Sequence, residues 1–125
     1  MTRVLIVEDD APIRELIVDG LRHDGYDVEE ASNGAEALDQ LRICCPDAIV
    51  LDLMMPAMHG WDFIEGYRNL TGGKSIPIVV LSAAGAIPRS MYALGVRRFI
   101  PKPFVMDELL TVLGEINPCS DRSAD

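Results

Sequence analysis

The sequence contains no apolar run long enough to cross a membrane, because none approaches the roughly 18 residues that a spanning helix needs. We also expect no signal peptide. The short apolar run at the N-terminus passes directly into three acidic residues, at positions 8–10, and does not resemble a signal segment with a cleavage site. We therefore expect a cytoplasmic protein without membrane contacts.

Motifs of several catalytic and metal-binding classes are also missing. The cysteines Cys44, Cys45 and Cys119 form no Cys-X-X-Cys pair and show no zinc-ligand spacing, so we interpret them as reduced thiols. His23 and His59 have no partners at ligand spacing and are interpreted as structural or surface residues. The chain has no GxGxxG, GxSxG or HExxH motif, which argues against a dinucleotide site, a hydrolase nucleophile and a zinc protease.

Basic residues are scarce, with 11 lysines and arginines against 20 acidic residues and a formal net charge of −9. The acidic excess lies in residues 1–66, which hold 15 acids and 4 bases. This charge disfavours contact with nucleic-acid phosphates and suits a cation site or a basic partner. We therefore predict no direct binding of nucleic acid.

The chain does contain enough apolar material for one core. Its 125 residues, 49% of them hydrophobic, match a single domain and exclude a disordered chain. We expect one domain at residues 1–117 and a polar C-terminal tail at residues 118–125.

Strand and helix patterns alternate along the chain. Short apolar runs predict strands at 4–7, 48–51 and 77–81, and an alternating run predicts one at 26–31. A fifth strand is expected at 97–100, before the Pro-Lys-Pro sequence at 101–103. Helical spacing predicts helices between and after them, covering 13–21, 33–41, 61–70, 89–94 and 109–116. Such alternation gives an α/β fold in which a five-stranded parallel sheet has helices on both faces. We expect the strand order 2-1-3-4-5.

Local signals bound the first two helices. The first helix is expected to begin near Pro12, to end near Gly25, and to place four apolar residues on one face: Ile13, Leu16, Ile17 and Leu21. Asn33 and Glu36, three residues apart, predict a capping box at the start of the second helix.

Polar residues follow the strands at the edge where such sheets bind ligands. They are Glu8, Asp9 and Asp10 after the first strand, Asp52 after the third, Ser82 after the fourth and Lys102 after the fifth. Singly, each has a simpler interpretation, such as a helix cap for Asp10 or a surface lysine for Lys102. Their coincidence at the ends of four strands favours one common site.

The chemistry of this set favours phosphoryl transfer with a hard cation. Two carboxylates about 4 Å apart repel by on the order of 4 kcal/mol in a protein-like dielectric, and a divalent cation relieves that repulsion. Mg²⁺ suits a site with few carboxylates and several retained waters. Ser82 and Lys102 can supply a donor and a positive charge to phosphoryl oxygens, which makes Asp52 the candidate nucleophile for an aspartyl phosphate.

Four stretches resemble the receiver domain of two-component response regulators, the CheY-like superfamily: LIVEDD with APIRELI, DLMMPAMHG, LSA and PKPF. The resemblance covers residues 3 to about 116 and implies a flavodoxin-like fold. It implies that Asp52 is the phosphoacceptor, that Lys102 binds the phosphoryl group, and that Ser82 is the switch hydroxyl and Phe99 the switch aromatic residue. It also implies a cis peptide bond before Pro103.

The same resemblance implies a Mg²⁺ site. Its ligands would be Glu8, Asp9, Asp52 and the backbone carbonyl of Met54, with Asp9 binding directly and Glu8 through water. The implied phosphoryl donor is a sensor histidine kinase or a histidine phosphotransfer protein. The implied output is a downstream protein that contacts the face formed by the fourth helix, fifth strand and fifth helix.

The sequence departs from the family pattern between Ser82 and Lys102, a stretch about two residues shorter than in many relatives. The mode of dimerisation is therefore open, and we expect a monomer or a weak phosphorylation-dependent dimer. A stand-alone regulator, a phosphorelay intermediate and a receiver from a larger protein all remain compatible with the sequence.

Three functions are compatible with these residues. The leading interpretation is a phosphorylation-controlled signalling module that assists its own phosphorylation and slow dephosphorylation without being an enzyme for other substrates. The alternative is a receiver-fold binding module that signals without phosphorylation, against which the intact acidic, Ser82 and Lys102 set argues. The third is a phosphohydrolase, against which Met54 argues, because a second acid would be expected two residues after Asp52.

Overall fold

The computed structural model describes residues 2–43, 46–52, 66, 76–82 and 96–116. The predicted helices at 61–70 and 89–94 and the tail at 118–125 are not covered by these ranges, apart from residue 66, which is helical.

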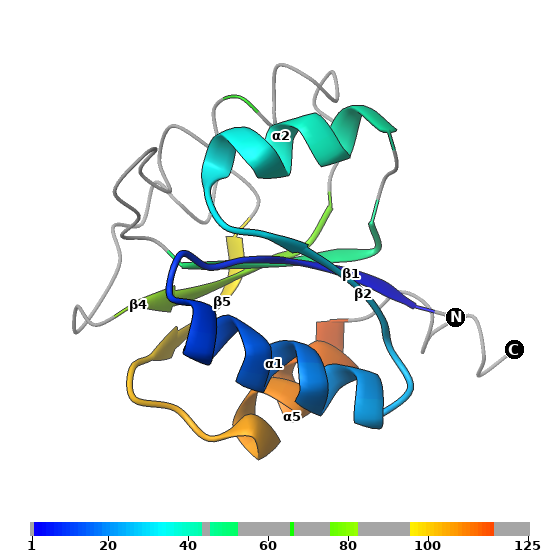
Figure 1. Cartoon of the computed structure of the whole chain (residues 1–125). Coiled ribbons are helices and arrows are strands. Elements are labelled where there is room, and N and C mark those ends of the chain that lie inside the picture. Colours follow the sequence, from blue (N-terminus) through cyan, green and yellow to red (C-terminus); the bar gives the residue numbers. More distant parts are fainter. Residues whose placement is uncertain (1, 44–45, 53–65, 67–75, 83–95, 117–125) are drawn as a thin grey trace, which may run out of the picture.

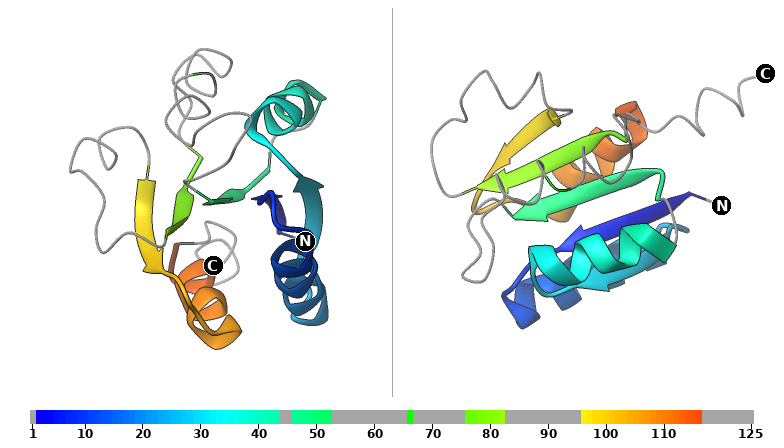
Figure 2. Two further views of the ribbon diagram at one scale, coloured as in Figure 1. Left: turned by 60° about the vertical axis from the view of Figure 1, so that its left-hand side comes forward. Right: turned by 90° about the horizontal axis from the view of Figure 1, so that it is seen from above.

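A five-stranded parallel sheet forms the centre of the molecule, in the order β2-β1-β3-β4-β5. The strands are β1 (Arg3–Val7), β2 (Asp27–Ala31), β3 (Ala48–Asp52), β4 (Ile78–Ser82) and β5 (Val96–Pro101). Figure 2 shows them side by side. The predicted order is confirmed, and each predicted strand end lies within one residue of the observed end.

Helices cover both faces of the sheet, as expected (Figure 1). The helices α1 (Ala11–His23) and α5 (Met106–Ile116) lie on one face, and α2 (Gly34–Ile43) lies on the other. Each face has its own apolar cluster, because β3 and β4 are buried along their whole length and direct alternate side chains to opposite faces. The cluster on the α2 face includes Ala37 and Leu41, and the other includes Leu21 and Leu109.

The helix α1 begins and ends at the predicted signals. The side chain of Asp10 accepts a hydrogen bond from the backbone N–H of Ile13 at 3.1 Å, and a proline occupies the first turn. The helix ends at His23, and Gly25 follows with φ of +95°, a conformation that L side chains rarely adopt.

The buried face of α1 differs from the predicted one at Leu16. Ile17, Val18 and Leu21 are buried, whereas Leu16 is 56% exposed. The stripe that meets the sheet is centred on Ile17 and Leu21, so Val18 lies on the core side. Leu16 lies instead at the edge of the helix, where it lines a groove next to Lys102 and Phe104.

The start of α2 has only half of the predicted capping box. The side chain of Asn33 accepts a hydrogen bond from the backbone N–H of Glu36 at 2.8 Å, as expected. The carboxylate of Glu36, however, accepts from the backbone N–H of Ser32 at 2.9 Å and from its hydroxyl at 3.2 Å. The reciprocal bond is thus made one residue earlier than in a standard capping box.

Within the described ranges, no helix combines the length and the apolar character that crossing a membrane would demand.

Candidate functional site

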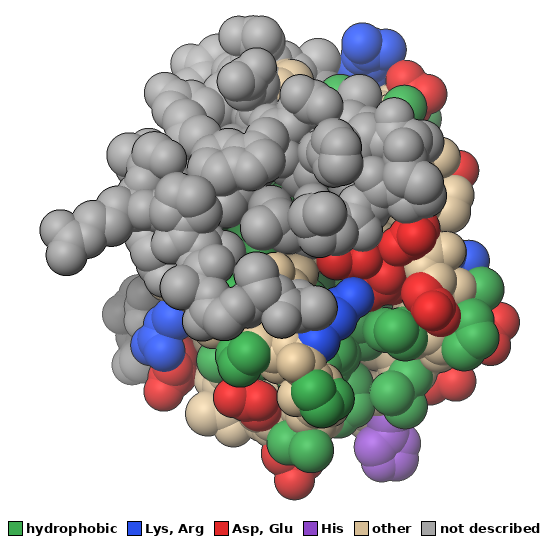
Figure 3. All heavy atoms as spheres, turned by 90° about the vertical axis from the view of Figure 1, so that its left-hand side faces the viewer, with side chains coloured by type: hydrophobic (Ala, Val, Ile, Leu, Met, Phe, Trp, Pro, Cys, Tyr) green, Lys and Arg blue, Asp and Glu red, His purple; other side chains and the backbone are tan. Residues whose placement is uncertain are grey.

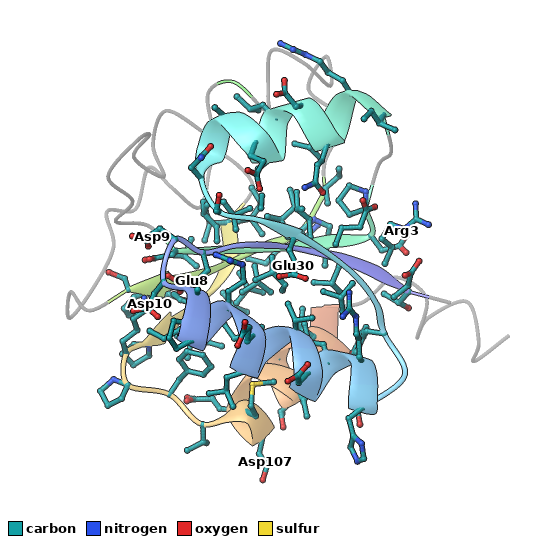
Figure 4. All side chains as sticks on the ribbon, viewed as in Figure 1. Arg3, Glu8, Asp9, Asp10, Glu30 and Asp107 are labelled. Atoms are coloured by element: carbon teal, nitrogen blue, oxygen red, sulfur yellow. The ribbon has the colours of Figure 1, made fainter. Side chains whose placement is uncertain are left out.

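The carboxyl ends of four strands bring the predicted polar residues together. Asp52 and Ser82 are the last residues of β3 and β4, and Glu8 follows β1 directly. Lys102 follows β5, and its peptide bond to Pro103 is cis, as the resemblance implies. Figure 4 shows the Glu8 and Asp9 side chains at this edge of the sheet, beside the start of α1.

The Lys102 ammonium lies between two carboxylates. Its Nζ atom is 3.3 Å from Glu8 Oε1 and 3.4 Å from Asp52 Oδ2. The backbone N–H of Lys102 donates to the carbonyl of Ser82 at 2.8 Å, which ties the start of the β5–α5 connection to the end of β4. The position of the ammonium is therefore set by both its backbone and its side-chain contacts.

Burial and neighbouring charges shift the pKa values of Glu8 and Lys102. Glu8 is 1% exposed. Burial, followed by the hydrogen bond and charge of Asp52, raises the pKa of Glu8 to about 7, although the charge of Lys102 and the backbone N–H of Asp10 act in the opposite direction. Burial alone would lower the pKa of Lys102, but the negative charges of Glu8 and Asp52 together raise it. The ammonium thus stays charged while Glu8 binds protons near neutral pH.

The acidic side chains at this edge fit a hard divalent cation. One carboxylate oxygen from each of Glu8, Asp9 and Asp52 lies within 4.8 Å of the others. Glu8 and Asp52 are buried and Asp9 is exposed, so the cluster opens to solvent on the side of Asp9. An all-oxygen set with an open side suits Mg²⁺, which retains several waters. Met54, whose carbonyl the resemblance adds to this set, lies outside the described residues.

Asp10 lies next to this cluster but has a different role. Its side chain caps α1, and its backbone N–H donates to Glu8 Oε2 at 3.3 Å. The simpler interpretation of Asp10 as a helix cap is therefore correct.

Ser82 and Phe99 share one face of the sheet. Strand register pairs Ser82 with Pro101 and Val80 with Phe99, so the two side chains point to the same side on neighbouring strands. Ser82 is fully buried. Phe99 is partly buried against the apolar cluster under α2.

One residue in contact with the site, Arg14, was not predicted from the sequence. The Arg14 guanidinium donates through Nη1 to the backbone carbonyl of Glu8 at 2.9 Å. It also forms an ion pair with Glu30 on β2, with Nε 3.3 Å from Oε1. Its signal in the sequence was its place within the APIRELI stretch, one turn into α1 and shortly after the acidic residues.

An apolar groove adjoins the site and was also not predicted. It has a volume of about 390 Å³ and is lined by Ile13, Leu16, Lys102, Pro103 and Phe104. Figure 3 shows hydrophobic side chains next to the charged ones on this side of the molecule. Leu16, whose exposure helical periodicity does not predict, is one of the residues that line the groove.

The sequence matches known proteins over most of its length. The family model described as the response regulator receiver domain matches residues 4–114. Response regulator MprA of Mycobacterium tuberculosis is 42% identical over 111 residues, which make up 86% of this chain and 47% of that protein. MprA of Mycobacterium avium is 40% identical over 110 residues, with the same coverage. The chain spans about half the length of these curated relatives.

Solved structures show the same fold. The chemotaxis response regulator CheY4 of Vibrio cholerae superposes with a TM-score of 0.85 at 32% identity, covering 93% of this chain and 98% of that chain. The receiver domain of the sensor histidine kinase PA1611 of Pseudomonas aeruginosa superposes with a TM-score of 0.78 at 26% identity, covering 91% and 95%. That second structure has a magnesium ion coordinated in its active site cleft.

Proposed function

The chain belongs to the response regulator receiver domain family of two-component signalling, and from that premise we propose that a phosphoryl group on Asp52 switches it. The observation that carries the proposal is the Lys102 ammonium, 3.4 Å from the buried Asp52 carboxylate at the end of β3. A fixed cation at this point can bind the oxygens of a phosphoryl group that is being transferred to Asp52.

In the proposed reaction, a carboxylate oxygen of Asp52 attacks the phosphorus atom. The bond from phosphorus to the donor breaks, and the donor, an imidazole nitrogen or the oxygen of acetyl phosphate, keeps the electron pair. Lys102 and the Ser82 hydroxyl interact with the phosphoryl oxygens in the product. The chain thereby assists its own phosphorylation and slow dephosphorylation, without acting as an enzyme on other substrates.

Mg²⁺ is the proposed cofactor. Glu8, Asp9 and Asp52 would hold it with their clustered carboxylate oxygens, and the carbonyl of Met54 would complete the set. When bound, the ion offsets the negative charge of the carboxylates and of the phosphoryl oxygens. Support comes from the all-oxygen donor set and from the magnesium-bound receiver of Pseudomonas aeruginosa.

The proposed donor is a histidine kinase or a histidine phosphotransfer protein. The groove beside Lys102 supports a protein donor, because it offers an apolar surface next to the phosphoacceptor. For the output, a downstream protein would contact the face that includes β5 and α5. We propose a monomer or a weak phosphorylation-dependent dimer, without direct contacts to nucleic acid.

One assay tests this proposal against its two alternatives. The protein is incubated with acetyl phosphate and Mg²⁺, and its intact mass is followed with time. We expect one phosphoryl group that persists and that is absent from Asp52→Asn. An unchanged mass would favour a binding module that signals without phosphorylation, and rapid release of phosphate without a lasting adduct would favour a phosphohydrolase. Full labelling of Asp52→Asn would show that another residue is the acceptor.

A further inference from the structure

Arg14 holds the peptide unit that joins the first two acidic residues. Its Nη1 atom donates to the backbone carbonyl of Glu8 at 2.9 Å, while its Nε atom is 3.3 Å from Glu30 Oε1. Only 19% of the Arg14 side chain is exposed. Glu8 directly follows β1 and Glu30 is the last residue but one of the neighbouring strand β2 (both are labelled in Figure 4), so the guanidinium links α1 to both strands.

The contact constrains Asp9 through covalent geometry. A peptide unit is planar, so a hydrogen bond that orients the Glu8 carbonyl also orients the N–H and the Cα atom of Asp9. On its other side, the N–H of Glu8 donates to the carbonyl of Ala31 at 3.1 Å. The backbone of Glu8 is thus fixed at both its amide and its carbonyl, and the direction in which Asp9 leaves the strand is fixed with it.

Within the acidic cluster, Asp9 is the residue whose carboxylate orientation depends most on its backbone. Glu8 and Asp52 are buried and packed, whereas Asp9 is exposed. An exposed carboxylate can adopt many orientations, and binding a cation requires one of them. A fixed backbone reduces the number of orientations that the metal has to select.

We propose that Arg14 is a positioning residue for the cation site, and that it raises the affinity for Mg²⁺ by orienting Asp9 through the Glu8 carbonyl. This inference rests on the proposed function, because it assumes that the acidic cluster binds Mg²⁺. Arg14 itself would contact neither the cation nor the phosphoryl group. Groups that orient metal ligands in this way typically change metal affinity by about 10- to 100-fold.

Electrostatics alone predicts a change in Mg²⁺ affinity in the opposite direction when Arg14 is replaced. A guanidinium near a cation site repels the cation, so removal of its charge alone would tighten Mg²⁺ binding. Loss of positioning would weaken it. The direction of the change therefore distinguishes a positioning residue from a nearby charge.

The test measures Mg²⁺ binding by isothermal titration calorimetry in the parent protein and in Arg14→Met. We expect the dissociation constant to rise by about tenfold or more. Arg3→Met is the matched control, because it removes the same charge and another ion pair to β2. Arg3 is the first residue of β1, so it lies at the opposite end of that strand from Glu8. It contacts Asp27 at 3.1 Å and Glu29 at 3.6 Å. Its dissociation constant should stay within about twofold of that of the parent.

A second variant separates positioning from folding. Arg14→Lys keeps a donor for the Glu8 carbonyl but loses the planar fork that also reaches Glu30, so its dissociation constant should fall between those of the parent and Arg14→Met. Urea unfolding in EDTA, run in parallel, reports any loss of stability without metal. Labelling of Arg14→Met by acetyl phosphate should recover when Mg²⁺ is raised in proportion to the new constant.

The outcomes are distinguishable. If the parent binds no Mg²⁺, the proposed cation site and this inference are both wrong. If the parent binds Mg²⁺ and Arg14→Met binds it equally or more tightly, the inference alone is overturned. If Arg3→Met and Arg14→Met weaken binding equally, the effect comes from general loss of an ion pair, and Arg14 has no positioning role.

Discussion

Lys102 Nζ lies 3.3 Å from Glu8 Oε1, although the two residues are 94 positions apart in the chain. The same ammonium is 3.4 Å from Asp52 Oδ2. One cation thus serves two buried carboxylates, and the site has an excess of negative charge when only protein groups are counted. A proton on Glu8 or a bound divalent cation can offset that excess, so the stability of the protein should depend on both pH and Mg²⁺.

Protonation of Glu8 should make the stability of the metal-free protein depend on pH. Burial and Asp52 raise its pKa in the folded state to about 7, from an ordinary value of 4.5. The protonated form is therefore favoured by folding. Its contribution is fully present below pH 4.5 and is lost as the pH rises through 7. The loss amounts to about 3 kcal/mol for a shift of this size.

The measurement compares Glu8→Gln with the parent by urea unfolding in EDTA between pH 5 and pH 8. The neutral amide does not ionise, so the variant should gain stability relative to the parent as the pH rises. Glu15→Gln, which removes an exposed carboxylate from α1, should show no such trend. A constant difference between Glu8→Gln and the parent across this range would contradict the prediction.

Mg²⁺ should stabilise the folded protein through Asp9. A ligand that binds only the native state raises the free energy of unfolding by about 2.7 kcal/mol at a hundredfold excess over its dissociation constant. Asp9→Ala should abolish this rise, measured as the dependence of the melting temperature on Mg²⁺. Asp10→Ala is the control, since it removes the cap of α1 and about 1 kcal/mol of stability but leaves the cluster intact. An equal Mg²⁺ response in Asp9→Ala and the parent would exclude Asp9 as a ligand.

The sheet and the position of the site could be predicted because they depend on strong, local patterns. The runs at 48–51 and 78–81 are apolar at every position, which is typical of strands covered on both faces, and the structure buries both strands throughout. Once the strands are ordered, the residues at their carboxyl ends must meet. This is why Asp52, Ser82 and Lys102 could be assigned to one edge before the structure was known.

The features that were missed or wrongly predicted from the sequence depend on contacts that leave no pattern in it. Arg14 binds a backbone carbonyl, which is present at every residue and so carries no sequence signal. Leu16 follows helical spacing, but periodicity locates a broad stripe only, and residues at its edge are buried or exposed according to their neighbours. The bond from Ser32 to Glu36 depends likewise on how the chain enters α2.

A substitution in the groove next to Lys102 should distinguish phosphorylation by a small donor from phosphorylation by a protein donor. Leu16 is 56% exposed and lines the groove, so Leu16→Gln should have little effect on stability. Labelling by acetyl phosphate should match that of the parent. Transfer from a phosphorylated histidine kinase that labels the parent should slow by about tenfold, as for a central interface residue. Ile43→Gln, which changes an 86% exposed residue on α2, should behave as the parent in both assays. Equal slowing of both donors would place the effect at the phosphoacceptor instead of at a docking surface.

Ser82 should couple phosphorylation to Phe99 without being needed for phosphorylation itself. The two side chains lie on the same face of neighbouring strands, and Ser82 ends β4 at the edge where Asp52 ends β3. A new charge-assisted hydrogen bond from its hydroxyl to the phosphoryl group would draw the end of β4 toward Asp52. That displacement would change the space open to the partly buried Phe99 ring.

Ser82→Ala should therefore accept a phosphoryl group to full stoichiometry while the NMR signals of the Phe99 ring stay unchanged. Ser82→Thr retains the hydroxyl and should retain the response. The ring signals are assigned with Phe99→Leu. If Ser82→Ala and the parent show the same change at Phe99, the hydroxyl does not transmit the signal.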